Sequence, residues 1–121
     1  MTVRRIVANF AAADPGLARA FYETLFDLKV VMDQGWILTF ASDAAQAPQL
    51  SLASEGGSGT PVPDLSIEVE DLDEVYRRAV AAGCEILYGI AEEPWGVRRF
   101  YLRDPLGRVL NVLSHSERDG A

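Results

Sequence analysis

The sequence predicts an α+β fold built from two copies of one unit, in which a strand and a helix precede three further strands. Each half of the chain contains one segment of helical periodicity. In both halves, segments in which every second residue is apolar lie before and after it, in the same order. The spacing repeats too, because the expected helix caps Asp14 and Asp71 are as far apart as the strand positions Val7 and Asp64. The 121 residues are the length of a single domain.

The first unit is expected to span residues 3–53. Alternating side chains predict a strand over residues 3–13, and Asp14 followed by Pro15 is a typical helix start. The buried stripe of that helix carries Leu17, Phe21 and Leu25, which recur every fourth residue. Three β-rich segments follow, at residues 28–32, 36–41 and 49–53.

A connector rich in glycine and proline occupies residues 54–63, and the second unit is expected over residues 64–114. Asp71 and Glu74 form a capping box for its helix, and Gly83 ends it. The strands are predicted at residues 64–70, 84–90, 97–103 and 108–114, with a tight turn at residues 104–107 and a tail over residues 115–121.

Composition excludes several classes of protein. The net charge of −7 disfavours a nucleic-acid backbone or an anionic membrane as the main partner. No segment is long and apolar enough to span a bilayer, and Cys84 is the only cysteine, so we expect a cytoplasmic protein without disulfides. Since His115 is the only histidine, no site can use two imidazoles; we expect a surface position for it in the tail.

Three stretches, AADPGLARAFYETLFDLKV, DLSIEVEDLDEVYRRAVAAGCEI and EPWGVRRFYLRDPLGRVLNVL, together with the paired order of the units, resemble the vicinal oxygen chelate superfamily. This superfamily contains glyoxalases, extradiol dioxygenases and bleomycin-resistance proteins. The resemblance covers nearly the whole chain. It implies two βαβββ modules whose curved mixed sheets surround a cup, and a homodimer with the cups near the interface.

Enzymes of the superfamily hold a divalent metal in the cup, on the first and last strands of each module. The matching positions here are Val7, Ser51 (or Gln49 in a register shifted by two), Asp64 and Asn111. Transition metals need about three strong donors, and these positions offer one carboxylate. The resemblance therefore implies no metal and no cofactor, and it favours the branch that binds small molecules.

Two kinds of side chain are candidates for binding the ligand, and we assign no catalytic residue. Polar side chains on the face opposite the apolar stripe either line the cup or form the solvated face of a sheet; aromatic side chains can stack on a planar molecule, although Trp36 also suits the sheet core. The predicted ligand-binding residues are Asn9, Trp36, Gln49, Ser51, Asp64, Ser66, Trp95, Tyr101 and Asn111. Arg98 and Arg99 either form ion pairs with Glu92 or Glu93, most commonly at the surface, or meet an anionic ligand.

These observations favour a protein that sequesters an antibiotic or another planar or cationic compound without metal. The alternative is a glyoxalase-like or other lyase or isomerase with an unusual metal site. In that case Asp64 and Glu68, which alternate on one strand face, could supply a general base.

Overall fold

The computed structural model describes residues 1, 4–46 and 49–115. It confirms the α+β class. A single turn of 3-10 helix, η1, precedes the first α-helix. The elements in chain order are η1 (Pro15–Ala18), α1 (Arg19–Phe26), β1 (Lys29–Asp33), β2 (Leu38–Ala41), β3 (Leu65–Glu68), α2 (Leu72–Ala81), β4 (Ile86–Glu93), β5 (Val97–Arg103) and β6 (Val109–His115).

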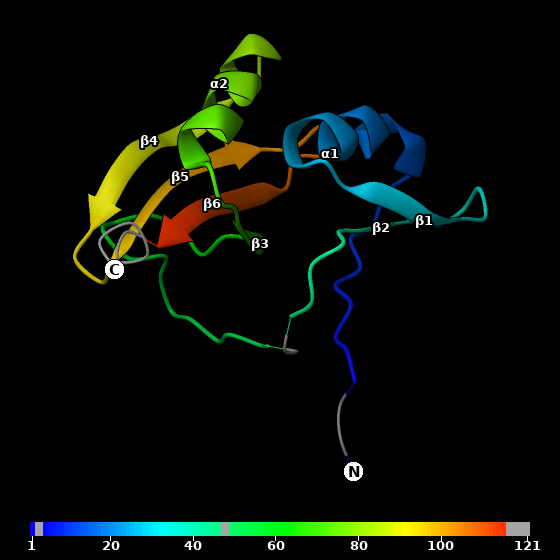
Figure 1. The fold of residues 1–121 in the computed structure, drawn as a ribbon, viewed down its shortest axis with the longest axis horizontal. Helices are drawn as coiled ribbons and strands as arrows, with labels where there is room; N and C mark the ends of the chain where they lie inside the picture. Colours follow the sequence, from blue (N-terminus) through cyan, green and yellow to red (C-terminus); the bar gives the residue numbers. More distant parts are fainter. Residues whose placement is uncertain (2–3, 47–48, 116–121) are drawn as a thin grey trace.

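The second unit forms the predicted strand, helix and three strands. Its sheet has the order β3-β6-β5-β4 and is mixed, because β3 runs parallel to β6 while the other pairs are antiparallel. The α2 helix starts where the capping box predicts, since the Asp71 carboxylate accepts a hydrogen bond from the Glu74 amide at 3.0 Å. Figure 1 shows both helices above the sheet, while residues 49–64 pass beneath it.

The first unit differs from the expectation. Residues 4–13 and 49–53 were expected to be strands, and the structure assigns strand conformation to neither; the sheet consists of the β1–β2 hairpin alone. Alternating apolar and polar side chains show only that a segment would suit a half-buried sheet. A strand forms where a neighbouring strand supplies hydrogen bonds and other side chains bury the apolar face. Leu50 and Leu52 remain 77% and 91% exposed, so this segment has no such surface within the described chain.

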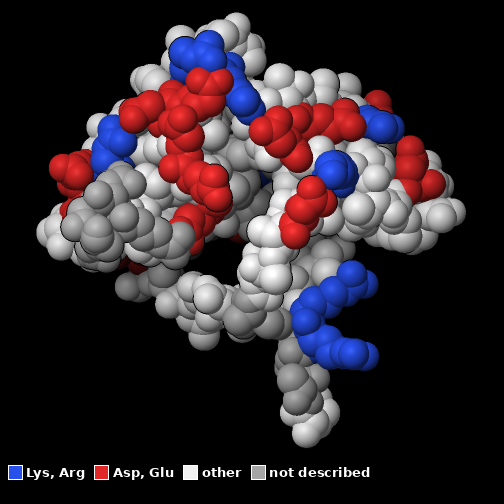
Figure 2. Space-filling model, viewed as in Figure 1, with Lys and Arg blue, Asp and Glu red and all other residues white. Residues whose placement is uncertain are grey.

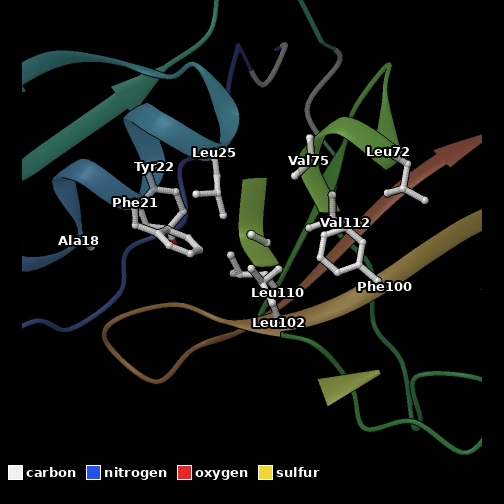
Figure 3. Close-up of a cluster of buried hydrophobic side chains, with 11 residues drawn as sticks. Ala18, Phe21, Tyr22, Leu25, Leu72, Val75, Phe100, Leu102, Leu110 and Val112 are labelled. Carbon is white, nitrogen blue, oxygen red and sulfur yellow. The ribbon is translucent and has the colours of Figure 1, made fainter. Parts of the chain in front are cut away.

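The hydrophobic core lies between the two helices and one face of the four-stranded sheet (Figure 3). The α1 helix contributes Phe21, Tyr22 and Leu25, and Leu25 is 1% exposed. Side chains of α2 and of the sheet complete the cluster, among them Leu72, Val75, Ala79, Phe100, Leu102, Leu110 and Val112. One cluster of buried side chains therefore contains residues of both units.

A buried hydrogen bond also joins the units. The Tyr22 hydroxyl on α1 donates to Oδ2 of Asp104 at 2.7 Å. Oδ1 of the same carboxylate accepts the amides of Leu106 and Arg108, which fixes the turn between β5 and β6. The Asp-Pro-Leu-Gly turn is thus both a chain reversal and an attachment point for the first helix.

Charge is distributed unevenly over the surface. Figure 2 shows acidic side chains across the face that carries α2, and basic side chains on the N-terminal arm below the body. Ion pairs such as Lys29–Asp43 are exposed and contribute little to stability. Within the described ranges, no helix has both the length and the apolar character that a membrane span requires.

Candidate functional site

A cavity of about 500 Å³ lies in the first unit, between the N-terminal segment and the β1–β2 hairpin. Of the predicted ligand-binding residues, it brings together Asn9 and Trp36. Trp36 sits in the hairpin turn and is 77% exposed, so it lines the cavity and is not part of the core. The other lining residues are Val7, Ala8, Phe10, Ala11, Ala12, Pro15, Ala18, Tyr22, Leu28, Ile37, Leu38, Thr39, Phe40, Leu65, Asp104 and Leu106.

The wall of this cavity is mainly apolar and aromatic. Tyr22 and Phe40 pack with ring centroids 5.4 Å apart, and Phe10 lies under the Arg108 guanidinium at 5.2 Å. Arg108 also donates to the Ala11 carbonyl at 3.4 Å, which attaches the N-terminal segment to the second unit. Such a lining, with a few polar groups among aromatic rings, is typical of pockets for small organic molecules.

Buried polar chemistry in the cavity wall comes from Tyr22 and Asp104. Burial, and then the hydrogen bond to the Asp104 carboxylate, raise the pKa of Tyr22 far above the ordinary tyrosine value. The phenol therefore stays protonated at every physiological pH and keeps donating to Asp104. The Arg108 guanidinium also lies near this pair and acts in the opposite sense on the pKa of Tyr22.

The predicted residues from the end of the first unit lie elsewhere. Gln49 and Ser51 are exposed in a segment without regular structure, and neither lines the cavity. Asp64 accepts the Val109 amide at 2.8 Å, so it holds β3 against β6. The Asp64 carboxylate is therefore hydrogen-bonded to the backbone of the sheet.

Ser66 and Asn111 face each other across the parallel β3–β6 pair. Nδ2 of Asn111 donates to the Ser66 hydroxyl at 3.1 Å. Asn111 is 9% exposed, and its Oδ1 is buried without a hydrogen-bond partner among the described residues. A buried acceptor without a donor costs about 1–3 kcal/mol, so this amide is suited to accept from a ligand or a water molecule.

Arg99 is the residue that sequence reasoning misjudged. The expected pair with Glu93 is confirmed for Arg99, at 2.7 Å, but the expected surface position is wrong, because Arg99 is 3% exposed. Arg98 is partly exposed, as expected, and forms an ion pair with Asp73 at 3.2 Å. The sequence did contain a signal for the burial of Arg99. Val97, Arg99 and Tyr101 are spaced by two residues along β5, so all three side chains lie on the same face of the strand.

The Arg99 guanidinium lies among three aromatic rings and binds the connector. Its carbon is 5.5, 5.0 and 5.1 Å from the ring centroids of Tyr88, Trp95 and Tyr101. Nη1 donates to the Gly56 carbonyl at 2.9 Å and Nη2 to the Gly57 carbonyl at 3.1 Å. The predicted ligand residues Trp95 and Tyr101 are therefore gathered around Arg99, and Tyr101 is fully buried.

Glu93 completes this cluster. Its carboxylate accepts from Arg99, from the Ser58 hydroxyl at 3.0 Å and from the Tyr88 hydroxyl at 3.2 Å. Burial acts to raise the pKa of Glu93, but the hydrogen bonds from Arg99 and Ser58 outweigh it, and the pKa lies below its ordinary value. Glu93 is therefore ionised at neutral pH and neutralises Arg99.

His115 is not in a tail. It ends β6 opposite Val97, and its Nδ1 is 3.0 Å from the Glu68 carboxylate on β3. The expected surface position is confirmed, because 38% of the His115 side chain is exposed, whereas β6 ends one residue later than predicted and includes His115. A carboxylate beside a histidine fixes the ring orientation, as in general bases.

The metal positions implied by the family do not form a metal site. Asp64 is engaged with the backbone, Asn111 is an amide, and Val7 has no donor atom. Across residues 4–46 and 49–115, no three histidine, cysteine, aspartate or glutamate side chains come together. These donors do not fit a transition metal.

A four-stranded unit in the predicted order, a shorter unit of helix and hairpin, and an aromatic cavity define an α+β protein. The chain belongs to the glyoxalase/bleomycin resistance protein/dioxygenase superfamily, whose profile it matches over residues 5–112. This confirms the resemblance seen in the sequence. No curated protein matches the chain.

Solved structures show the same fold at low identity. A superfamily member from Sphaerobacter thermophilus DSM 20745 has a TM-score of 0.67 and 21% identity, covering 95% of this chain and 98% of its own. TioX from Micromonospora sp. ML1 has a TM-score of 0.62 and 21% identity over 90% and 94%. A lactoylglutathione lyase from Agrobacterium tumefaciens has a TM-score of 0.60 and 22% identity over 88% and 89%.

Proposed function

We propose that the protein binds a small organic molecule in this cavity without metal, and so sequesters an antibiotic or another planar or cationic compound. The observation that carries this proposal is the cavity of about 500 Å³ with its aromatic lining and the Asp104 carboxylate in its wall. The net charge of −7 adds a weak attraction for cations at physiological salt.

Isothermal titration against a panel of planar natural products, with acriflavine as a cationic reference, tests this function. Trp36→Ala removes the exposed ring at the cavity mouth and should weaken binding about tenfold, since a stacking contact is worth roughly 1 kcal/mol or more. Val80→Ala is the matched control, because Val80 is 54% exposed on α2 and does not line the cavity. Absence of heat with every compound would contradict the proposal.

A homodimer is the second part of this proposal. Leu50 and Leu52 leave apolar surface exposed beside an unpaired segment, and contact with a second copy would cover it. Sedimentation velocity at micromolar concentration should then show a species of twice 13.2 kDa. Leu52→Asp should shift it to the monomer, whereas Leu17→Asp on η1 should not. A 13.2 kDa species for the unmodified protein would exclude the dimer.

We also propose a cytoplasmic location.

The alternative function is an enzyme of the lyase or isomerase type. The contact between His115 and Glu68 favours it, because an imidazole oriented by a carboxylate can remove a proton from a bound substrate. Metal analysis after gentle purification tests the alternative with an unusual metal. A stoichiometric transition metal would favour the enzyme, and Asp64→Ala would then be expected to lose it.

A further inference from the structure

A second cavity of about 500 Å³ lies on the side of the sheet that carries both helices (Figure 1). Its wall is formed by η1 and α1, by the chain that leaves α2, and by the turn after β5. We call it the helix-side cavity. Among the described residues, Asp104 alone lines both this cavity and the aromatic cavity of the first unit. A molecule bound here would therefore occupy a different place.

Small residues keep the helix-side cavity open. Ala20 and Thr24 lie one turn apart on the same face of α1. Ala82 and Gly83, which follow α2, line the same cavity. Beyond its chain neighbours, a Cβ atom added at Gly83 would meet no atom within 4 Å. Side chains this short leave space between α1 and the chain that leaves α2.

The floor of the helix-side cavity is apolar. Phe21 and Leu25, also one turn apart on α1, are 8% and 1% exposed, and Pro105 lies beside them in the wall. A floor of this kind suits the apolar part of a small molecule, and the volume lies within the range of about 300–1,000 Å³ that is usual for ligand sites.

A loose ion pair completes the wall. The Arg103 amide donates to the Glu85 carbonyl at 3.0 Å, so the two residues are neighbours at the end of the β4–β5 pair. Nε of Arg103 is 3.5 Å from Oε1 of Glu85, and the two side chains are 40% and 61% exposed. An exposed pair of this kind contributes little to stability. The charges of a ligand can therefore replace it at small cost.

The guanidinium of Arg103 is oriented for such a ligand. Nη1 donates to the Gly107 carbonyl at 3.1 Å, whereas Nη2 has no hydrogen-bond partner in the described part of the chain. The other charged side chain of the wall, Asp104, is already occupied, because its oxygens accept from the Tyr22 hydroxyl and from two backbone amides. One guanidinium and one carboxylate thus remain for a ligand.

From these contacts we infer that the helix-side cavity binds a free α-amino acid with an aromatic or large aliphatic side chain. Its carboxylate accepts from Nε and Nη2 of Arg103, an edge of the guanidinium that matches a carboxylate. Its ammonium group donates to Glu85, and its side chain packs on Phe21 and Leu25. This inference goes beyond the proposed function and does not depend on it, because the aromatic cavity takes no part.

The ion pair selects for a molecule that carries both charges. A carboxylate without an ammonium group would lie beside Glu85, and an amine without a carboxylate would lie beside Arg103, so each would meet a like charge. In an α-amino acid a single carbon atom separates the two charged groups. One molecule can therefore reach both members of the pair.

Cys84 provides the readout, because it lines the helix-side cavity and is the only cysteine of the chain. Burial raises the pKa of the Cys84 thiol, so its alkylation by N-ethylmaleimide at pH 7 is slow enough to follow by mass spectrometry. L-Phenylalanine at about ten times its Kd should slow alkylation about tenfold, since only unoccupied molecules react. Unchanged alkylation up to the solubility limit of L-phenylalanine would overturn the inference.

Two analogues test the need for both charges. 3-Phenylpropionate lacks the ammonium group and 2-phenylethylamine lacks the carboxylate, so each should require about a tenfold higher concentration for the same protection of Cys84. Equal protection by either analogue would overturn the assignment to an amino acid.

Charge variants test the two contacts separately. Arg103→Gln should weaken L-phenylalanine binding about tenfold without weakening that of 2-phenylethylamine. Glu85→Gln should weaken L-phenylalanine binding to a similar extent without weakening that of 3-phenylpropionate. Asp43→Asn, in the exposed pair with Lys29, is the control and should change none of the three. Equal losses for all three compounds would indicate a merely structural role and refute the assigned contacts.

A matched pair of alanine variants tests the place of binding. Ala20→Leu fills the helix-side cavity from α1 and should abolish protection of Cys84 by L-phenylalanine. Ala81→Leu makes the same change at the exposed end of α2, outside the cavity wall, and should leave protection intact. Protection that persists in Ala20→Leu would contradict the proposed site.

Discussion

The hydrogen bond from Tyr22 to Asp104 should make a measurable contribution to stability. Tyr22→Phe removes the hydroxyl that donates at 2.7 Å and leaves the shape of the ring unchanged. Hydrogen bonds to charged groups contribute about 1.5–3 kcal/mol, and Asp104 is 4% exposed, so water does not readily replace the donor. We expect the free energy of unfolding at pH 7 to fall by about 2 kcal/mol.

The pH dependence provides a sharper test. The folded protein holds the Tyr22 proton more tightly than the unfolded chain, because the pKa is raised. The contribution is therefore fully present below the unfolded value of about 10 and is lost as the pH rises above it, by about 1.4 kcal/mol per pH unit. The difference between wild type and Tyr22→Phe should shrink from about 2 kcal/mol at pH 7 to about 0.6 kcal/mol at pH 11.

Urea denaturation of both proteins at pH 7, 9, 10 and 11 measures this difference, and contributions from other titrating groups cancel in the comparison. Tyr76→Phe is the control. The Tyr76 ring is half-buried and packs against Phe100, and the Tyr76 hydroxyl makes no hydrogen bond within the described residues. It should change the free energy of unfolding by less than about 0.5 kcal/mol at each pH. A difference for Tyr22→Phe that is constant from pH 7 to pH 11 would refute the reasoning.

Two further predictions concern the core and the buried ion pair. Leu25→Ala should lower the free energy of unfolding by about 3 kcal/mol in urea, because it opens a cavity between the helices and the sheet, whereas the exposed Leu17→Ala should change it by less than about 0.5 kcal/mol; equal effects would contradict the core described above. Glu93→Gln should cost about 2 kcal/mol at pH 7 because it leaves Arg99 buried without a counter-charge. Since the pKa of Glu93 is lowered, the advantage of the wild type should disappear as the pH falls below the ordinary carboxyl range, and a pH-independent difference would argue against the ion pair.

The second unit shows how far local sequence signals reach. The capping box at Asp71, the stop at Gly83 and the Asp-Pro-Leu-Gly turn place its helix and strands within a few residues of the observed limits. These signals act between residues close in the sequence, so they survive without knowledge of the tertiary neighbours.

The candidate site was less accessible from sequence. Asn9 and Trp36 do line one cavity, but the burial of Arg99 depends on a connector that begins more than forty residues earlier in the chain. The periodicity of the sequence cannot predict which glycine carbonyl accepts a hydrogen bond from the Arg99 guanidinium. The Glu68–His115 contact is equally remote in sequence.

The caps, the turns and the order of elements in the second unit follow from the amino-acid sequence, because each depends on a few neighbouring side chains and on backbone geometry. Packing between distant parts of the chain decides whether residues 49–53 pair with a sheet edge and whether Trp36 is buried. It also decides which groups surround Arg99. Alternation states only that a segment could lie on a surface. The free energy that selects the surface comes from contacts between residues far apart along the chain.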